Sequence, residues 1–233
     1  MQSMTTGLAL GGLVPFSTGD FPGRLSAVLF TQGCPLRCRY CHNPHLWPRV
    51  HEGAVSWAGA MDWLKRRRGL LDAVVVSGGE PTIQAPLGSA LQQIRALGFA
   101  TGLHTAGVHP QRLAAVLKYV DCVGLDIKAP FGRYDLVAGS TASGERARRA
   151  LDIVVASGAA FEIRTTLHTA LLSEADMLAI AGELQERGIA QWTLQIVRPQ
   201  GCTDPALHTP ARPAWLETLM PSLTELVPGI IVR

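Results

Sequence analysis

The stretch GCPLRCRYCHN, residues 33–43, is the most informative part of this 233-residue sequence. It places Cys34, Cys38 and Cys41 with three residues between the first pair and two between the second. Glycine and proline around the cysteines are typical of a loop, which allows three thiolates to converge. Thiolates are soft ligands that select zinc, copper(I) or iron–sulfur clusters. The stretch therefore predicts a metal centre.

Several kinds of centre fit this spacing. Three cysteines on a four-iron cluster would leave one iron without a protein ligand, and an open position is typical of catalytic sites. A closed zinc site with His42 or His45 as fourth ligand is the main alternative. The C-x-x-C-H at 38–42 also has the spacing of a c-type haem attachment site, which would leave Cys34 unused and require export. No basic residue precedes Arg24, so a secretory signal is not expected, and five cysteines without signs of secretion disfavour disulfides.

The C-x3-C-x2-C pattern, with Tyr40 before the last cysteine, resembles the signature of the radical S-adenosylmethionine (SAM) superfamily. The strings DFPG (20–23), FTQGC (30–34) and YCHNP (40–44) are similar to the activating enzymes of glycyl-radical enzymes, most closely the anaerobic ribonucleoside-triphosphate reductase activating proteins. The resemblance implies a [4Fe-4S] cluster on the three cysteines and SAM at the open iron. Tyr40 and His42 are expected to contact these cofactors.

Composition is compatible with one domain over residues 1–233. Hydrophobic content is 47% and charged content 17%, which argues against disorder. A net charge of +3 is too small to indicate nucleic-acid binding, and no run approaches the roughly 18 apolar residues of a membrane span. Residues 1–24 are expected to be irregular and 25–233 to form the fold.

The remainder alternates short β-branched runs with helical patterns, which predicts βα units around a parallel sheet. The expected strands are 26–31, 72–77, 100–105, 122–127, 160–167 and 192–197, with 230–232 as a possible addition. The expected helices are 56–68, 87–97, 110–119, 145–157, 174–187 and 213–226. Six βα units fit the length. The fold class is α/β, and the resemblance implies a partial (β/α)6 TIM-like barrel, open on one side.

Polar residues at strand ends are the next candidates, because function collects at the carboxyl ends of strands in such barrels. Gly78 and Gly79 would let a ligand approach the backbone closely, with Glu80 as a neighbouring acceptor. In the families that this segment resembles, it receives the SAM ammonium. A plain βα turn is the alternative.

His104 and Thr105 end the following strand, where relatives often carry an acidic residue or asparagine. His104 is predicted to face the SAM carboxylate or ribose, or else to bond a backbone carbonyl. Thr105 is also expected to contact the cofactor.

Asp126 and Lys128 share a strand face and resemble the Asp-x-Lys motif of the activating enzymes, which lies around the SAM methionine part and the incoming glycyl loop. A rim salt bridge is the alternative. Arg164 is expected to pair with Glu162 or with SAM, since burying it unpaired is costly. Gln195 is expected at the same site.

Two cysteines lie outside the loop. Cys122 is expected to be a buried core thiol and Cys202 a loop thiol, because two scattered residues do not form a second cluster site.

The resemblance implies an enzyme that reductively cleaves SAM and abstracts a hydrogen atom from a glycine of a partner protein. The expected partner is anaerobic ribonucleotide reductase, with pyruvate formate-lyase or another glycyl-radical enzyme second. Radical SAM chemistry on a small molecule or peptide, and a non-catalytic metal or electron-transfer protein, are the alternatives. A one-electron donor such as flavodoxin or ferredoxin and an oxygen-poor cytoplasm are expected.

Overall fold

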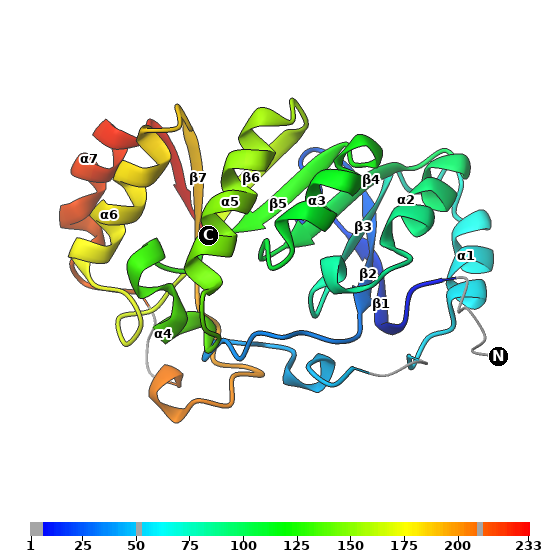
Figure 1. Cartoon of the computed structure of the whole chain (residues 1–233), viewed down its shortest axis with the longest axis horizontal. Coiled ribbons are helices and arrows are strands. Elements are labelled where there is room, and N and C mark those ends of the chain that lie inside the picture. The colour runs from blue at the N-terminus through cyan, green and yellow to red at the C-terminus, as the bar shows by residue number, and fades with distance from the viewer. Residues whose placement is uncertain (1–6, 50–52, 209–211) are drawn as a thin grey trace.

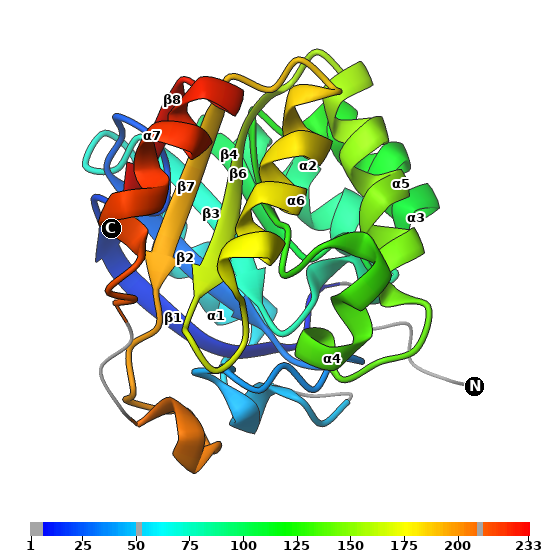
Figure 2. The ribbon, with the colours of Figure 1, turned by 90° about the vertical axis from the view of Figure 1, so that its left-hand side faces the viewer.

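The computed structural model describes residues 7–49, 53–208 and 212–233, and one sheet organises them (Figures 1 and 2). Its strands follow chain order; β1 is antiparallel to β2 and all later neighbours are parallel. The strands are β1 (Leu10–Ser17), β2 (Ser26–Thr31), β3 (Ala73–Gly78), β4 (Ala100–Thr105), β5 (Cys122–Asp126), β6 (Ala160–Leu167), β7 (Gln191–Ile196) and β8 (Gly229–Val232).

Helices connect the parallel strands along one face of the sheet (Figure 1). The α-helices are α1 (Trp57–Lys65), α2 (Leu87–Ala96), α3 (Pro110–Val116), α4 (Tyr134–Ala138), α5 (Ser143–Ala156), α6 (Glu174–Gln185) and α7 (Leu216–Leu226). Short 3-10 helices are η1 (Pro44–Leu46), η2 (Pro81–Ile83), η3 (Leu117–Tyr119), η4 (Phe131–Arg133) and η5 (Pro205–Leu207). In the described ranges, no helix is long and apolar enough to cross a membrane.

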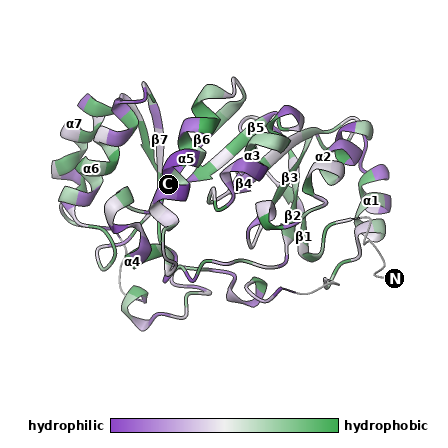
Figure 3. Cartoon of the chain, viewed as in Figure 1, coloured by the Kyte–Doolittle hydropathy of each residue, from purple (hydrophilic) through white to green (hydrophobic). Residues whose placement is uncertain are grey.

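The two sheet faces bury different sets of side chains, because successive strand residues point to opposite sides. Leu29, Val76 and Leu103 belong to the large core shared with the helices. Val28 and Val75, which are paired in register, belong to a smaller cluster on the other face. Hydrophobic colour runs along the central strands, whereas the helices are mixed (Figure 3). These strands are buried on both faces, as parallel sheets require.

The sequence predicted this architecture well. The bounds of β2, β4 and β6 match the prediction, and six βα units run from β2 to α7. β8 supplies the additional strand expected near residues 230–232. In the described chain the sheet is not closed, since β1 and β8 are its two edges. The α/β partial barrel, open on one side, is confirmed.

The prediction of an irregular segment over residues 1–24 is wrong for β1. Its sequence, LGGLVPFS, lacks the alternation of a half-buried strand, and pairing with β2 stabilises it instead. Phe21, which follows β1, is only 6% exposed and packs with Val28 and Val75 on the inner face. The N-terminal segment therefore contributes both an edge strand and an apolar side chain to the barrel interior.

We expect Phe21→Ala to lower the free energy of unfolding by about 3 kcal/mol, because the deletion leaves a cavity in the inner cluster. Phe16→Ala is the matched control: Phe16 is 57% exposed, and its loss should cost about 0.5 kcal/mol or less. Urea denaturation followed by circular dichroism measures both. Equal destabilisation by the two variants would contradict the inner packing role of Phe21.

Candidate active site

A cavity of about 790 Å³ opens where the cysteine loop meets the strand ends. All three predicted cluster ligands, Cys34, Cys38 and Cys41, contribute to its lining. Predicted cofactor contacts that also line it are Tyr40, His42, Gly78, Gly79, His104, Thr105, Asp126, Lys128, Arg164 and Gln195. Parallel pairing puts these strand ends at one edge of the sheet, which explains why residues so distant in sequence meet.

Backbone hydrogen bonds hold the cysteine loop on two sides. Cys34 N donates to Trp47 O at 3.1 Å, just after η1, and Arg37 N donates to Ala138 O at 2.9 Å, at the end of α4. Within the loop, Cys41 N donates to Cys38 O at 3.0 Å. The loop position is thus fixed by elements far along the chain as well as by β2.

All five cysteines are free thiols in the structure. Cys38 is buried, and Cys34 and Cys41 are half-buried against the cavity. Burial, followed by the charge of Glu80, raises the pKa of Cys34 to about 12. A thiol in such surroundings needs a positive centre to ionise, and a bound metal provides one.

Two glycines bring the backbone of β3 close to the cysteine loop. Gly78 has a φ of 109°, which other residues rarely adopt. A Cβ on Gly79 would lie 2.2 Å from Gly33 O, so only glycine fits there. The cavity wall at this point is backbone, as the sequence predicted.

Glu80 is an exception among the predicted cofactor contacts, because it does not line the cavity and is 1% exposed. Its Oε1 accepts from the hydroxyl groups of Thr82 and Thr105, both at 2.6 Å. Its Oε2 accepts from Ala106 N at 2.8 Å. Glu80 therefore ties the end of β3 to the end of β4, behind the cavity wall.

The charged group in the cavity centres on Asp126. Its carboxylate accepts from Arg164 Nε at 3.0 Å and Lys128 Nζ at 3.4 Å. Lys128 Nζ also donates to the Tyr40 hydroxyl at 3.1 Å, which links the strand to the cysteine loop. Asp126 and Arg164 are direct neighbours in the β5–β6 register. Asp126 and Lys128 lie on one face, as predicted, and they also form the salt bridge that was the alternative.

The cations outweigh burial at Asp126. Burial by itself would raise the pKa of this carboxyl, but Arg164 and then Lys128 hold it at about 2. Burial would likewise lower the pKa of Lys128, but Tyr40 and Asp126 raise it well above its ordinary value. Asp126 and Lys128 are therefore charged at neutral pH, and the guanidinium of Arg164 gives the group a net positive charge.

Glu162 is not the partner of Arg164. It accepts from the Thr193 hydroxyl at 2.7 Å and pairs with Arg233 Nη2 at 3.1 Å. Although Glu162 and Arg164 share a strand face, the carboxylate directly across the register from Arg164 belongs to Asp126.

His104 takes the second of its two predicted roles. Its Nε2 lies 2.9 Å from Asp20 O, and the ring contributes to the cavity wall. Burial, and then the charge of Arg164, lowers its pKa to about 3, so the imidazole is neutral. This contact joins β4 to the N-terminal segment.

Sequence reasoning missed several cavity residues, including Ser17, Asp20, Trp47 and Arg233. Ser17 and Asp20 fall in the segment expected to be irregular. The DFPG string at 20–23 was a signal that this segment belongs to the site. Arg233 reaches the cavity through β8, and nothing in its local sequence indicates that position.

Three thiols that line one cavity are the kind of donor that iron–sulfur clusters use. Over residues 7–49, 53–208 and 212–233, no group of three or more His, Cys, Asp or Glu side chains is already drawn together around one metal position. His45, one of the possible fourth zinc ligands, does not line the cavity. The three thiols instead share a roomy cavity wall, which suits a multi-iron group.

Residues 28–192 match the family model described as Radical SAM superfamily. This chain belongs to the radical SAM superfamily. Membership implies a [4Fe-4S] cluster and SAM as cofactors. The predicted superfamily is confirmed, and so is the prediction that the chain is an enzyme.

Relatives of this radical SAM protein carry names from the predicted subgroup. A Methanocaldococcus jannaschii protein, provisionally named a glycyl-radical enzyme activating enzyme, is 28% identical over 204 residues, covering 84% of this chain and 82% of that protein. The pyruvate formate-lyase-activating enzyme of Clostridium pasteurianum is 36% identical over 114 residues, covering 47% of this chain. That match spans 48% of the Clostridium protein, about half of its length.

Solved structures show the same fold. Streptococcus suis SuiB, bound to precursor peptide SuiA, aligns with a TM-score of 0.69 at 16% identity, covering 88% of this chain and 48% of SuiB. QueE from Escherichia coli aligns with a TM-score of 0.57 at 17% identity, covering 97% of this chain and 93% of QueE. At these identities the likeness concerns the fold alone.

The two remaining cysteines of this radical SAM chain lie outside the cavity lining. Cys122 is buried in the inner cluster with Phe21 and Val28, so the predicted core thiol is confirmed. Cys202 is also buried, with its Sγ 3.3 Å from Arg198 O and 3.5 Å from Tyr40 O. It supports the back of the cysteine loop.

We expect Gly79→Ala to lower the free energy of unfolding by about 2 kcal/mol and to reduce iron loading, because the new methyl group would displace the Gly33 carbonyl. Gly132→Ala is the control, since a methyl group at that position would meet nothing within 4 Å. Urea denaturation and iron content after anaerobic reconstitution measure both effects. Normal loading of Gly79→Ala would show that the contact with Gly33 is dispensable.

Asp126 should give the protein an acid-sensitive stability. Its folded pKa, about 2, lies below the ordinary value of about 4, so its contribution is present above pH 4 and is lost as pH falls through 2. At neutral pH, Asp126→Asn should cost about 2 kcal/mol by leaving Arg164 without a counter-charge. Denaturation midpoints between pH 2 and 7 measure this, and the variant should lose less stability on acidification.

Asp62→Asn is the control, because Asp62 forms an exposed pair with Lys65. Its effect on stability should be small, because an exposed ion pair is screened by solvent. If Asp126→Asn and wild type lose stability in parallel on acidification, Asp126 does not supply the acid-sensitive part.

Proposed function

We propose that this protein is a glycyl-radical-enzyme activating enzyme that cleaves SAM reductively at a [4Fe-4S] cluster held by Cys34, Cys38 and Cys41. Its protein substrate is anaerobic ribonucleoside-triphosphate reductase. The observation that carries the proposal is the shared cavity, which is lined by the three thiols together with Asp126 and Lys128.

The cysteine loop supplies three ligands and leaves the cavity side open. Bound there, the cluster and SAM supply one-electron cleavage of a carbon–sulfur bond, which yields a carbon radical able to abstract hydrogen from a glycine. The protein contributes placement: backbone hydrogen bonds fix the loop, and Gly78 and Gly79 allow close approach to it.

The charged group orients the polar end of SAM in this proposal. Arg164 and Lys128 carry two positive charges against one negative charge on Asp126, so a net positive charge faces the cavity. That balance favours the SAM carboxylate, while Asp126 is an acceptor for the SAM ammonium. The neutral His104 ring offers a hydrogen-bonding wall without adding charge. Glu80 acts indirectly, by holding the β3 and β4 ends in position.

Two observations support a protein rather than a small substrate. The sheet is open between its edge strands, β1 and β8, in the described chain. Relatives carry activating-enzyme names, including one that covers most of both chains. Pyruvate formate-lyase is the second candidate partner, because the Clostridium relative is named for it. We also propose one domain over residues 1–233, a flavodoxin or ferredoxin donor, and the cytoplasm as location.

Anaerobically reconstituted protein, given SAM and dithionite, should form 5′-deoxyadenosine. Cys38→Ala should abolish this product, because one cluster ligand is lost. Cys122→Ala is the matched control and should retain it, since Cys122 lies in the inner apolar cluster. Chromatographic quantification of the product measures all three proteins. Full iron loading of the wild type without SAM cleavage would overturn the proposal.

The partner is tested separately. Incubation with anaerobic ribonucleotide reductase should produce the doublet of a glycyl radical in electron paramagnetic resonance. Incubation with pyruvate formate-lyase should produce a weaker doublet. A stronger signal with pyruvate formate-lyase would move the assignment to that enzyme. If SAM is cleaved but neither enzyme shows a glycyl-radical signal, the substrate of this radical SAM protein is a different molecule.

A further inference from the structure

The outer face of the cysteine loop carries several cations, two of which form no ion pair within the described part of the chain. Between residues 21 and 51 the sequence has arginines at 24, 37, 39 and 49 and no acidic residue. Of the loop arginines, Arg39 pairs with Asp204 at 2.7 Å. Arg37 and Arg49 are exposed and form no ion pair with any residue that the structure describes.

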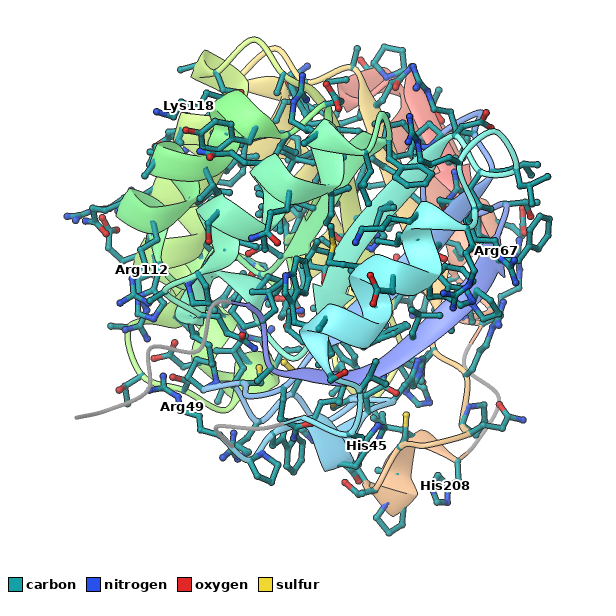
Figure 4. The ribbon with its side chains drawn as sticks, turned by 90° about the vertical axis from the view of Figure 1, so that its right-hand side faces the viewer. His45, Arg49, Arg67, Arg112, Lys118 and His208 are labelled. Atoms are coloured by element: carbon teal, nitrogen blue, oxygen red, sulfur yellow. The ribbon has the colours of Figure 1, made fainter. Side chains whose placement is uncertain are left out.

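Arg112, from α3, extends this surface. Its Nη1 donates to Ile83 O at 2.7 Å, so it is fixed by a carbonyl rather than by a carboxylate. Ile83 and the Arg49 side chain both pack against Gly33, next to Cys34. Figure 4 shows Arg49 and Arg112 on the same side of the molecule, both toward solvent. We call Arg37, Arg49 and Arg112, with Trp47, the basic rim.

Arg112 and Arg49 also share an electrostatic neighbour, His109. Burial, followed by the charge of Arg112, lowers the pKa of His109. Glu80 opposes this shift, and Arg146 and Arg49 add to it. The acidic residues Asp135 of α4 and Glu145 of α5 already have partners: Asp135 accepts from Ser143, and Glu145 pairs with Arg148 and Arg149. The rim therefore has positive charge available for a partner.

Trp47 connects the rim with the cavity. Its indole lies under the Arg37 guanidinium at 5.0 Å, and the residue also lines the cavity. Its carbonyl accepts from Cys34 N at 3.1 Å, and Arg37 Nη1 donates to Cys34 O at 2.8 Å. The rim is thus bonded directly to the backbone of a predicted cluster ligand, with no intervening layer of protein.

We propose that the basic rim is the docking surface for an acidic one-electron carrier protein of the flavodoxin class, which delivers its electron beside Cys34. The inference rests on the proposed function, since an electron carrier is needed only if the cavity holds a reducible cluster. Charge complementarity selects an acidic carrier, and contact with Cys34 places the entry point for the electron behind the cluster, away from the strand ends. The carrier is oxidised by one electron and the cluster is reduced by one.

The test compares two reductants on holoprotein. Stopped-flow spectroscopy follows cluster reduction by flavodoxin hydroquinone or by dithionite. Arg49→Glu should slow reduction by flavodoxin about tenfold or more and weaken its salt dependence, because electrostatic steering is lost. Reduction by dithionite should keep its wild-type rate. Arg49→Gln should have an intermediate effect.

Arg68→Glu is the matched control. Arg68 is exposed between α1 and β3, at the amino ends of the strands. Its substitution by Glu changes the net charge by the same amount as Arg49→Glu. Its neighbour Arg67 lies far from Arg49 and Arg112 in Figure 4. Arg68→Glu should leave both reduction rates close to wild type. Isothermal titration calorimetry of oxidised flavodoxin with each holoprotein gives a readout independent of activity, and only Arg49→Glu should weaken binding, about tenfold.

Equal effects of Arg49→Glu and Arg68→Glu on binding and on the flavodoxin-driven rate would overturn the proposal. So would a wild-type cluster that dithionite reduces but flavodoxin hydroquinone does not. Failure of the proposed function is seen separately, as absence of SAM cleavage with dithionite, which bypasses the rim.

Discussion

Parallel pairing from β2 to β8 is the constraint on which the site depends. A parallel ladder fixes all carboxyl ends at one edge, so every loop that leaves a strand there meets its neighbours. Gly78, Asp126 and Gln195 come from three different strands yet line one cavity with the cysteine loop. The central strands are mainly apolar and buried, and these three residues lie at or next to the last residue of their strands.

Buried charge in the site is compensated in two different ways. Glu80 is surrounded by hydroxyl and amide donors, and this satisfies its oxygens without placing a cation in the wall. Asp126 instead faces Arg164 and Lys128, whose charges remain available to the cavity. Two carboxylates at strand ends therefore have different roles: one fixes the wall and the other sets the potential of the site.

The N-terminal segment and the cysteine loop enclose the barrel from two directions. Phe21 packs against the inner sheet face, and Asp20 accepts from His104 through its backbone carbonyl. On the opposite side, Lys128 contacts Tyr40, and Arg37 N donates to Ala138 O. Such contacts between distant segments make the cavity a property of the folded chain. The basic rim gives the outer side of the same loop a separate role in our proposal, the docking of the electron carrier.

Local sequence was sufficient to predict the order of βα units, the bounds of several strands and the cysteine loop as the centre of the site, because hydrophobic periodicity and ligand spacing are local properties. It also indicated Asp126 with Lys128, since alternate residues of one strand share a face. Three features became clear only in the folded chain: LGGLVPFS pairs as an edge strand, Arg164 lies against Asp126 rather than Glu162, and Glu80 lies behind the cavity wall. Each of these depends on which strand lies alongside and in what register, and cross-strand register is a long-range property that local sequence does not encode.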